Sequence, residues 1–180
     1  MYPINGDIFN PGTNIKTQRI FTAQSTALSQ DPTGLGPSNA IPVEFGPAQG
    51  DSSDRIMMDA NGMITVNKEE LYRIRITLVF GRVGNPGVSE LLFRITANGT
   101  QLGITVPQKI SSGNVLNVYE FDSITSIPAG AAFVFEIMRD SSGNDSGGLV
   151  AGLVTADPGA WNDAPCARIF IDRFYNPDLE

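Results

Sequence analysis

Residues 71–80, with the sequence LYRIRITLVF, decide the fold class of this chain. The even-numbered positions are all apolar, whereas the odd-numbered positions include Arg73, Arg75 and Thr77. Side chains of a β-strand point alternately to opposite faces, so this period of two places one face in a core and the other toward solvent or a polar interface. A helix would scatter the apolar residues around its axis. The stretch therefore predicts a strand that crosses the core.

Shorter stretches of similar character lie on both sides of this strand and are separated by turn signals. The predicted strands cover residues 18–23, 41–45, 55–59, 63–66, 90–97, 115–124, 131–138, 149–154 and 166–175. Asn61-Gly62 separates two of them and Asn98-Gly99 follows another, and Asn-Gly is the strongest short hairpin signal. No convincing helix interrupts the series. The sequence predicts an all-β jelly-roll sandwich of about eight to ten antiparallel strands.

Composition supports one β-rich domain. The chain has 180 residues, of which 41% are hydrophobic and 17% charged, and it contains 19 Gly and 12 Pro. That length is enough for one domain with a substantial core, and the glycines and prolines indicate many turns. We predict an extended N-terminal arm over residues 1–20, a jelly-roll domain over residues 21–175 and a short tail over residues 176–180.

Several classes of function are disfavoured by composition. There is no histidine, so histidine-based acid–base chemistry and metal ligation are excluded, and the single cysteine, Cys166, cannot form an internal disulfide. The net charge of −7 opposes binding to a phosphate backbone, and no run is apolar for long enough to span a membrane. The N-terminus does not resemble a signal peptide, which predicts synthesis in a reducing cytoplasm. We expect no enzymatic activity, no cofactor, no metal, no nucleic acid and no membrane partner.

Two groups of acidic residues are candidate sites. Asp140, Asn144 and Asp145 lie in the loop DSSGNDSGG, but its spacing lacks the ligands of an EF-hand, and a polar turn is the better interpretation. Glu69, Glu70 and Glu90 could supply a carboxylate pair for glycoside hydrolysis. Such enzymes usually have a cleft rich in aromatic residues, and this chain has one Trp and four Tyr. The sequence therefore disfavours glycoside hydrolysis.

The order of the strands resembles that of the complement globular head and tumour necrosis factor superfamily. The resemblance rests on residues 41–45 and 55–80, which hold an apolar strand, an Asn-Gly hairpin, a strand ending in Val and a Tyr-containing core strand. The matching positions are Ile56, Asn61, Gly62, Ile64, Val66, Tyr72 and Ile74. Residues 91–99, 127–135 and 169–174 resemble later strands of the family, although Glu70 stands where the family usually has Gly. The resemblance implies a ten-strand jelly roll that assembles as a homotrimer.

Two strands carry large apolar residues on both faces, which a single sandwich core does not explain. Tyr119 and Phe121 alternate with Leu116 and Val118, while Ile169 and Ile171 alternate with the aromatic residues of the last strand. Obligate interfaces resemble a domain core cut in half and are rich in aromatic residues. The predicted trimer interface consists of Tyr119, Phe121, Phe170 and Phe174. The alternative is a β-bulge that returns all of these side chains to one core.

The acidic, cysteine-poor chain resembles virion proteins more than animal cytokines. Tailed bacteriophages use trimeric jelly rolls as cement or decoration proteins on the capsid, which predicts the outer capsid surface as the location and the major capsid protein as the partner. The arm carries four candidate capsid contacts, namely Ile4, Ile8, Phe9 and Ile15, and Trp161 is a candidate contact on a loop. The alternative function is a receptor-binding tip or head fibre that recognises a bacterial surface glycan or protein.

Overall fold

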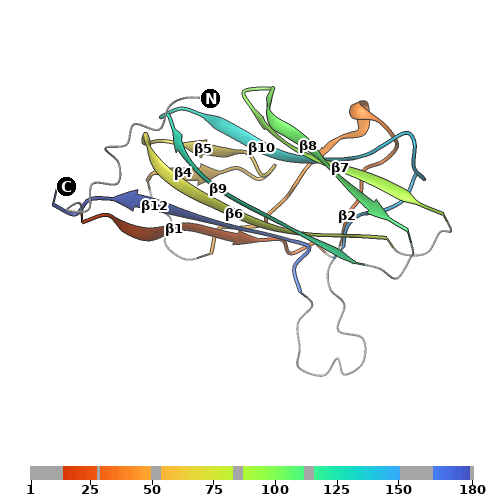
Figure 1. Cartoon of the computed structure of the whole chain (residues 1–180), viewed down its shortest axis with the longest axis horizontal. Helices are drawn as coiled ribbons and strands as arrows, with labels where there is room; N and C mark the ends of the chain where they lie inside the picture. Colours follow the sequence, from red (N-terminus) through yellow and green to blue (C-terminus); the bar gives the residue numbers. More distant parts are fainter. Residues whose placement is uncertain are drawn as a thin grey trace, which may run out of the picture.

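The computed structural model describes residues 14–27, 29–49, 54–82, 87–111, 116–150 and 164–178. These residues form two antiparallel six-stranded sheets stacked face to face (Figure 1). The first sheet consists of β1 (Lys16–Gln24), β12 (Ala167–Tyr175), β6 (Glu70–Gly81), β9 (Asn117–Ile127), β11 (Gly148–Val150) and β2 (Ser29–Gln30). The second sheet consists of β4 (Ile56–Met58), β5 (Ile64–Val66), β10 (Ala132–Arg139), β7 (Ser89–Ala97), β8 (Thr100–Ile110) and β3 (Ile41–Pro42). The predicted all-β sandwich is confirmed.

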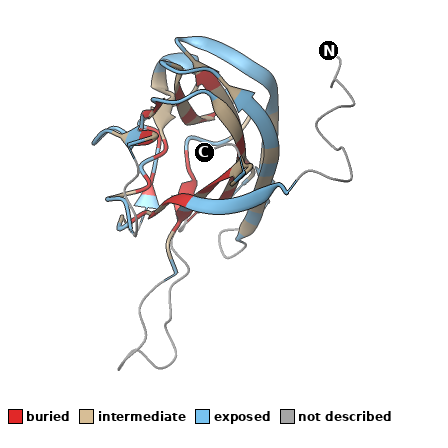
Figure 2. Cartoon of the chain, turned by 90° about the vertical axis from the view of Figure 1, so that its left-hand side faces the viewer, coloured by how far each residue is buried: buried red, intermediate tan, exposed pale blue. Residues whose placement is uncertain are grey.

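Strand β6 lies in the middle of the first sheet, as its strict alternation predicts. It pairs with β12 on one side and along its length with β9 on the other. Its apolar positions from Tyr72 to Phe80 are buried, and the alternate side chains are half-buried. The buried residues gather between the two sheets, while the exposed residues lie on the outer surfaces (Figure 2). The opposite sheet therefore covers only the side chains that point into the space between the sheets.

Aromatic rings fill the centre of the sandwich. Phe135 on β10 contacts Phe45 and Phe133 in edge-on geometry, with ring centroids 5.7 and 5.6 Å apart. It also stacks against Phe93 on β7, with centroids 6.2 Å apart and ring planes at 2°. These offset and edge-on arrangements are the ones that the quadrupoles of aromatic rings favour.

The Asn-Gly dipeptides form the predicted hairpin turns. Between β4 and β5, the carboxylate of Asp59 accepts hydrogen bonds from the backbone N–H groups of Asn61 and Met63, at 2.9 and 2.8 Å. Gly62 has a φ of +77°, a conformation that glycine adopts without steric cost. Asn98 and Gly99 join β7 to β8 with φ angles of +49° and +77°. Both dipeptides therefore supply the left-handed residues that tight turns need.

Several strands differ from the assignments made from the sequence. Strand β8 was not expected, because it is an edge strand with mostly exposed side chains and no buried face imposes a period of two on it. Strand β1 begins at Lys16, inside the segment assigned to the arm. Strand β9 pairs with β6 in an unbroken register, so the bulge considered as an alternative is absent from it. No helix among the described residues has the length and apolar character needed to cross a membrane.

Candidate interaction surface on the first sheet

The outer face of the first sheet is the side of β1, β12, β6 and β9 that points away from the core. In β12, Phe170, Asp172 and Phe174 point outward, because the intervening Ile169 and Ile171 are fully buried. Phe170 and Asp172 lie directly opposite Arg75 and Arg73 of β6, and Phe174 lies opposite Leu71. The register of these two strands therefore brings aromatic, acidic and basic side chains onto one surface.

Phe170 is the centre of a cluster of arginines. The guanidinium carbon of Arg19 lies 4.7 Å from its ring centroid, and those of Arg75 and Arg168 lie at 5.8 and 5.9 Å. A cation within about 6 Å of an aromatic face is attracted by the ring quadrupole. Because Phe170 remains only half-buried, the ring and its arginines are available to a partner.

Asp172 holds two of these arginines in place. Its carboxylate accepts a hydrogen bond from Arg19 Nε and another from Arg75 Nη2, the latter at 2.9 Å. Asp172 is 8% exposed, whereas the side chains of Arg19 and Arg75 are 42% and 37% exposed. The Nε of Arg75 is buried and has no hydrogen-bond partner among the described residues. The single carboxylate of Asp172 thus pairs with two guanidinium groups.

A second ion pair extends the face toward β9. Arg73 donates two hydrogen bonds to Asp122, from Nε to Oδ1 at 2.9 Å and from Nη2 to Oδ2 at 2.5 Å. These hydrogen bonds lower the pKa of the Asp122 carboxyl and raise the pKa of the Arg73 guanidinium. The pair is exposed, so its contribution to stability is small, but its bidentate geometry fixes the orientation of both side chains.

The same face carries exposed apolar side chains. Val118 and Ile124 of β9 are 62% and 56% exposed, and they lie opposite Val79 and Arg73 of β6. Apolar residues of this size on a sheet surface, beside arginine and an aromatic ring, have the composition of a protein–protein contact. The arrangement can bind a partner.

The predicted interface residues are divided between two faces, which corrects the grouping made from the sequence. Tyr119 and Phe121 lie opposite the buried Leu78 and Ile76 and pack against the core, and the Tyr119 ring lies 5.5 Å from that of Phe93. Phe170 and Phe174 point outward. Both faces of β9 carry large apolar residues, and only the neighbours of the strand in space determine which of them are enclosed. The outward residues of β9 are Val118, Glu120, Asp122 and Ile124.

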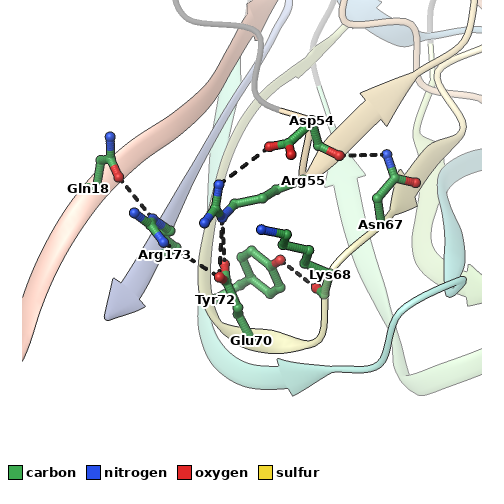
Figure 3. Close-up of polar contacts among 8 residues, drawn as sticks. All are labelled: Gln18, Asp54, Arg55, Asn67, Lys68, Glu70, Tyr72 and Arg173. Atoms are coloured by element: carbon green, nitrogen blue, oxygen red, sulfur yellow. Dashed lines mark hydrogen bonds and ion pairs between the residues drawn. The ribbon is translucent and has the colours of Figure 1, made fainter. Parts of the chain in front are cut away.

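Glu70 belongs to an ion-pair cluster at one end of the sandwich (Figure 3). It accepts hydrogen bonds from Arg55 Nε, at 3.1 and 3.3 Å, and from Arg173 Nη1 at 3.5 Å. Arg173 also donates to Gln18 at 2.8 Å. Beside them, the hydroxyl of Tyr72 donates to the carbonyl of Lys68 at 2.6 Å, and burial together with Glu70 raises the pKa of Tyr72 to about 12. The cluster joins β1, β12, β6 and the chain before β4, which is a structural role.

The carboxylates considered for glycoside hydrolysis do not meet. Glu70 opens β6, whereas Glu90 follows Ser89, which contacts Arg82 beyond the far end of β6. A strand of this length spans roughly 35–40 Å, far more than the separation of a carboxylate pair in a glycosidase. Glu90 is paired with Lys109 at 3.6 Å and accepts a hydrogen bond from Ser142. Glu69 is exposed on the loop before β6.

The remaining candidate residues either stabilise the local fold or lie outside the described residues. Asp140 caps its own turn through the backbone and hydroxyl groups of Ser142, which lower the pKa of its carboxyl. Cys166 is buried as a free thiol. No cluster of metal-ligating residues occurs in the part of the chain that the structure describes. Ile15 is 38% exposed and immediately precedes β1, whereas Ile4, Ile8, Phe9 and Trp161 lie outside the described residues.

Comparison with known proteins supports the fold. The structure of Eiger TNF from S. frugiperda is similar with a TM-score of 0.55 at 10% identity, covering 88% of this chain and 94% of that one. The globular domain of zebrafish complement 1qA is similar with a TM-score of 0.46 at 14% identity, covering 87% of this chain and 96% of that one. Neither the models of protein families nor the curated proteins gave a match to this sequence. The chain has the jelly-roll fold of tumour necrosis factor-like proteins.

Proposed function

We propose that this protein is a structural component that assembles as a homotrimer through the outer face of the first sheet. The observation that carries the proposal is the exposure of Val118 and Ile124 on the same sheet face as the arginine-flanked ring of Phe170. Burial of such a surface against another copy removes apolar area from water, and the ion pairs around it set the orientation of the subunits. The resemblance to the complement and tumour necrosis factor superfamily supports threefold closure of this contact.

We further propose that the trimer decorates the outer surface of a bacteriophage capsid and reinforces it without covalent bonds. Each trimer would contact several copies of the major capsid protein, and repeated weak contacts add through multivalency. The acidic composition, the absence of histidine and the apolar residues before β1 support this role over catalysis. The protein would be made in the host cytoplasm and act in the virion.

Substitution of Phe170 by glutamate should convert trimers to monomers. The substitution removes the apolar ring that the neighbouring subunit would bury, and the hydrated carboxylate in its place would have to lose water to enter the contact, which is unfavourable. Light scattering coupled to size-exclusion chromatography measures the change. Met57→Glu is the matched control, because Met57 is equally apolar and 62% exposed but belongs to the second sheet. Trimers of the Phe170 variant would place the interface elsewhere.

Binding to undecorated capsids tests the proposed role itself. Purified trimer should bind such capsids at a copy number on the order of hundreds per particle, as expected of a repeating lattice contact, and the monomeric Phe170→Glu variant should bind about a hundredfold more weakly. Quantitative mass spectrometry of the washed particles gives both values. A copy number on the order of ten, on native virions, would instead favour a receptor-binding tip. No binding to capsids of any kind would contradict the decoration role.

A further inference from the structure

A buried arginine with no ion-pair partner among the described residues lies at the end of the sandwich opposite the Glu70 cluster. Arg82 directly follows β6 and is 4% exposed. Its only hydrogen bond among the described residues runs from Nη1 to the hydroxyl of Ser89, at 3.5 Å, and its Nε is buried without a partner. No carboxylate of the described residues lies within ion-pair distance of it. A buried charge in this state is costly, because it has lost its hydration without a compensating contact.

Two buried hydroxyl groups complete the surroundings of this guanidinium. Ser89 is 0% exposed and Ser146 is 6% exposed, and their hydroxyl oxygens lie 2.8 Å apart. Whichever of the two donates to the other, the second hydroxyl proton has no acceptor among the described residues. Arginine has donors alone. Among the described residues, the cluster of Arg82, Ser89 and Ser146, called here the Arg82 cluster, therefore has more hydrogen-bond donors than acceptors.

Arg139 lies at the same end of the molecule and is a buried arginine with acceptors for its guanidinium nitrogens. It is 8% exposed and donates to the carbonyl of Gly147 at 2.7 Å and to Asp145 at 2.9 Å, with Asp31 at 3.7 Å. The segment that satisfies Arg139 also carries Ser146 of the Arg82 cluster. The two arginines thus lie in shared surroundings. Of these two, only Arg82 has a buried guanidinium nitrogen without an acceptor among the described residues.

We propose that the Arg82 cluster binds one small monovalent anion of about the size of chloride. Such an ion accepts hydrogen bonds from the guanidinium and from a serine hydroxyl, and its single charge balances that of Arg82. The enclosure of all three residues favours a small ion, and a phosphate dianion would exceed the charge available. This inference does not depend on the oligomeric state or on the capsid role proposed above.

Thermal unfolding of the full chain at constant ionic strength tests the proposal. Replacement of sodium gluconate by sodium chloride should raise the Tm of the wild type by roughly 5 °C once chloride exceeds its Kd a hundredfold. Arg82→Met keeps the stem and removes the charge, so its Tm should show only the general salt effect. In gluconate this variant should be at least as stable as the wild type, because it lacks the uncompensated charge.

Two further variants separate the anion from other causes. Arg139→Met removes the neighbouring, fully paired arginine and should lower the Tm in both salts while keeping the chloride-dependent rise. Ser146→Ala should weaken chloride binding about tenfold, the usual effect of one hydrogen bond to a charged group, and it serves as the test variant if Arg82→Met does not fold.

Crystals grown with bromide give an independent readout. An anomalous peak within hydrogen-bond distance of the Arg82 guanidinium and a serine hydroxyl is expected in the wild type and not in Arg82→Met. The proposal is overturned if the chloride-dependent rise is the same in the wild type and in Arg82→Met, or if bromide leaves no peak at the Arg82 cluster.

Discussion

Replacement of Phe135 by alanine is expected to lower the free energy of unfolding by about 3–5 kcal/mol, the range typical of a buried phenylalanine. The Phe135 side chain is fully buried and contacts the rings of Phe45, Phe93 and Phe133. Its removal leaves a cavity at the centre of the sandwich and deletes three ring–ring contacts, which add to the lost burial of apolar area. Denaturant-induced unfolding measures the change from the shift in midpoint.

The control for this substitution comes from the same strand. Val134 precedes Phe135 on β10 and points to the opposite face, where it is half-buried. Val134→Ala should cost about 1 kcal/mol or less, because most of the removed atoms are not enclosed. All variants are compared at one protein concentration, since assembly adds to apparent stability. Equal losses for the two variants would contradict the placement of the core between the sheets.

Gly62→Ala is expected to cost about 3–4 kcal/mol, whereas Gly99→Ala should cost about 1–2 kcal/mol. The two glycines share a φ of +77°, so the strain of a left-handed alanine is the same at both sites. They differ in the space around them. A Cβ at Gly62 would lie 2.4 Å from the carbonyl oxygen of Val43, whereas a Cβ at Gly99 would meet nothing within 4 Å. The difference between the variants therefore isolates the backbone contact.

Each glycine variant is a control for the other, because both close an Asn-Gly hairpin. Unfolding midpoints in denaturant give the two free-energy differences, and the slope of the transition shows whether the unfolded state has also changed. Losses of the same size in both variants would mean that the hairpin of β4 and β5 does not press against the chain at Val43. A larger loss of stability at Gly99 than at Gly62 would contradict the close contact of Gly62 with the Val43 carbonyl.

Local patterns predicted much of the fold and little of the surface that could bind a partner. The alternation of residues 71–80 depends only on the geometry of one strand, so the sequence alone was enough to predict β6 and its buried face. Strand β8 escaped prediction because an edge strand with exposed side chains has no such pattern. The contact between Arg19, Asp172 and Phe170 joins residues from the two ends of the chain, and no local signal specifies the register that creates it.

The sequence by itself determined that the chain is all-β, that its Asn-Gly dipeptides form hairpin turns and that two strands carry apolar residues on both faces. These properties follow from backbone geometry and side-chain period over a few residues. Only the tertiary structure decided that Tyr119 and Phe121 face the core while Phe170 faces outward. It also decided that Arg82 is buried with no carboxylate of the described residues beside it, although Arg139 has two. The physical reason is that enclosure and charge pairing depend on which strands stack and pair, and those neighbours are distant in sequence.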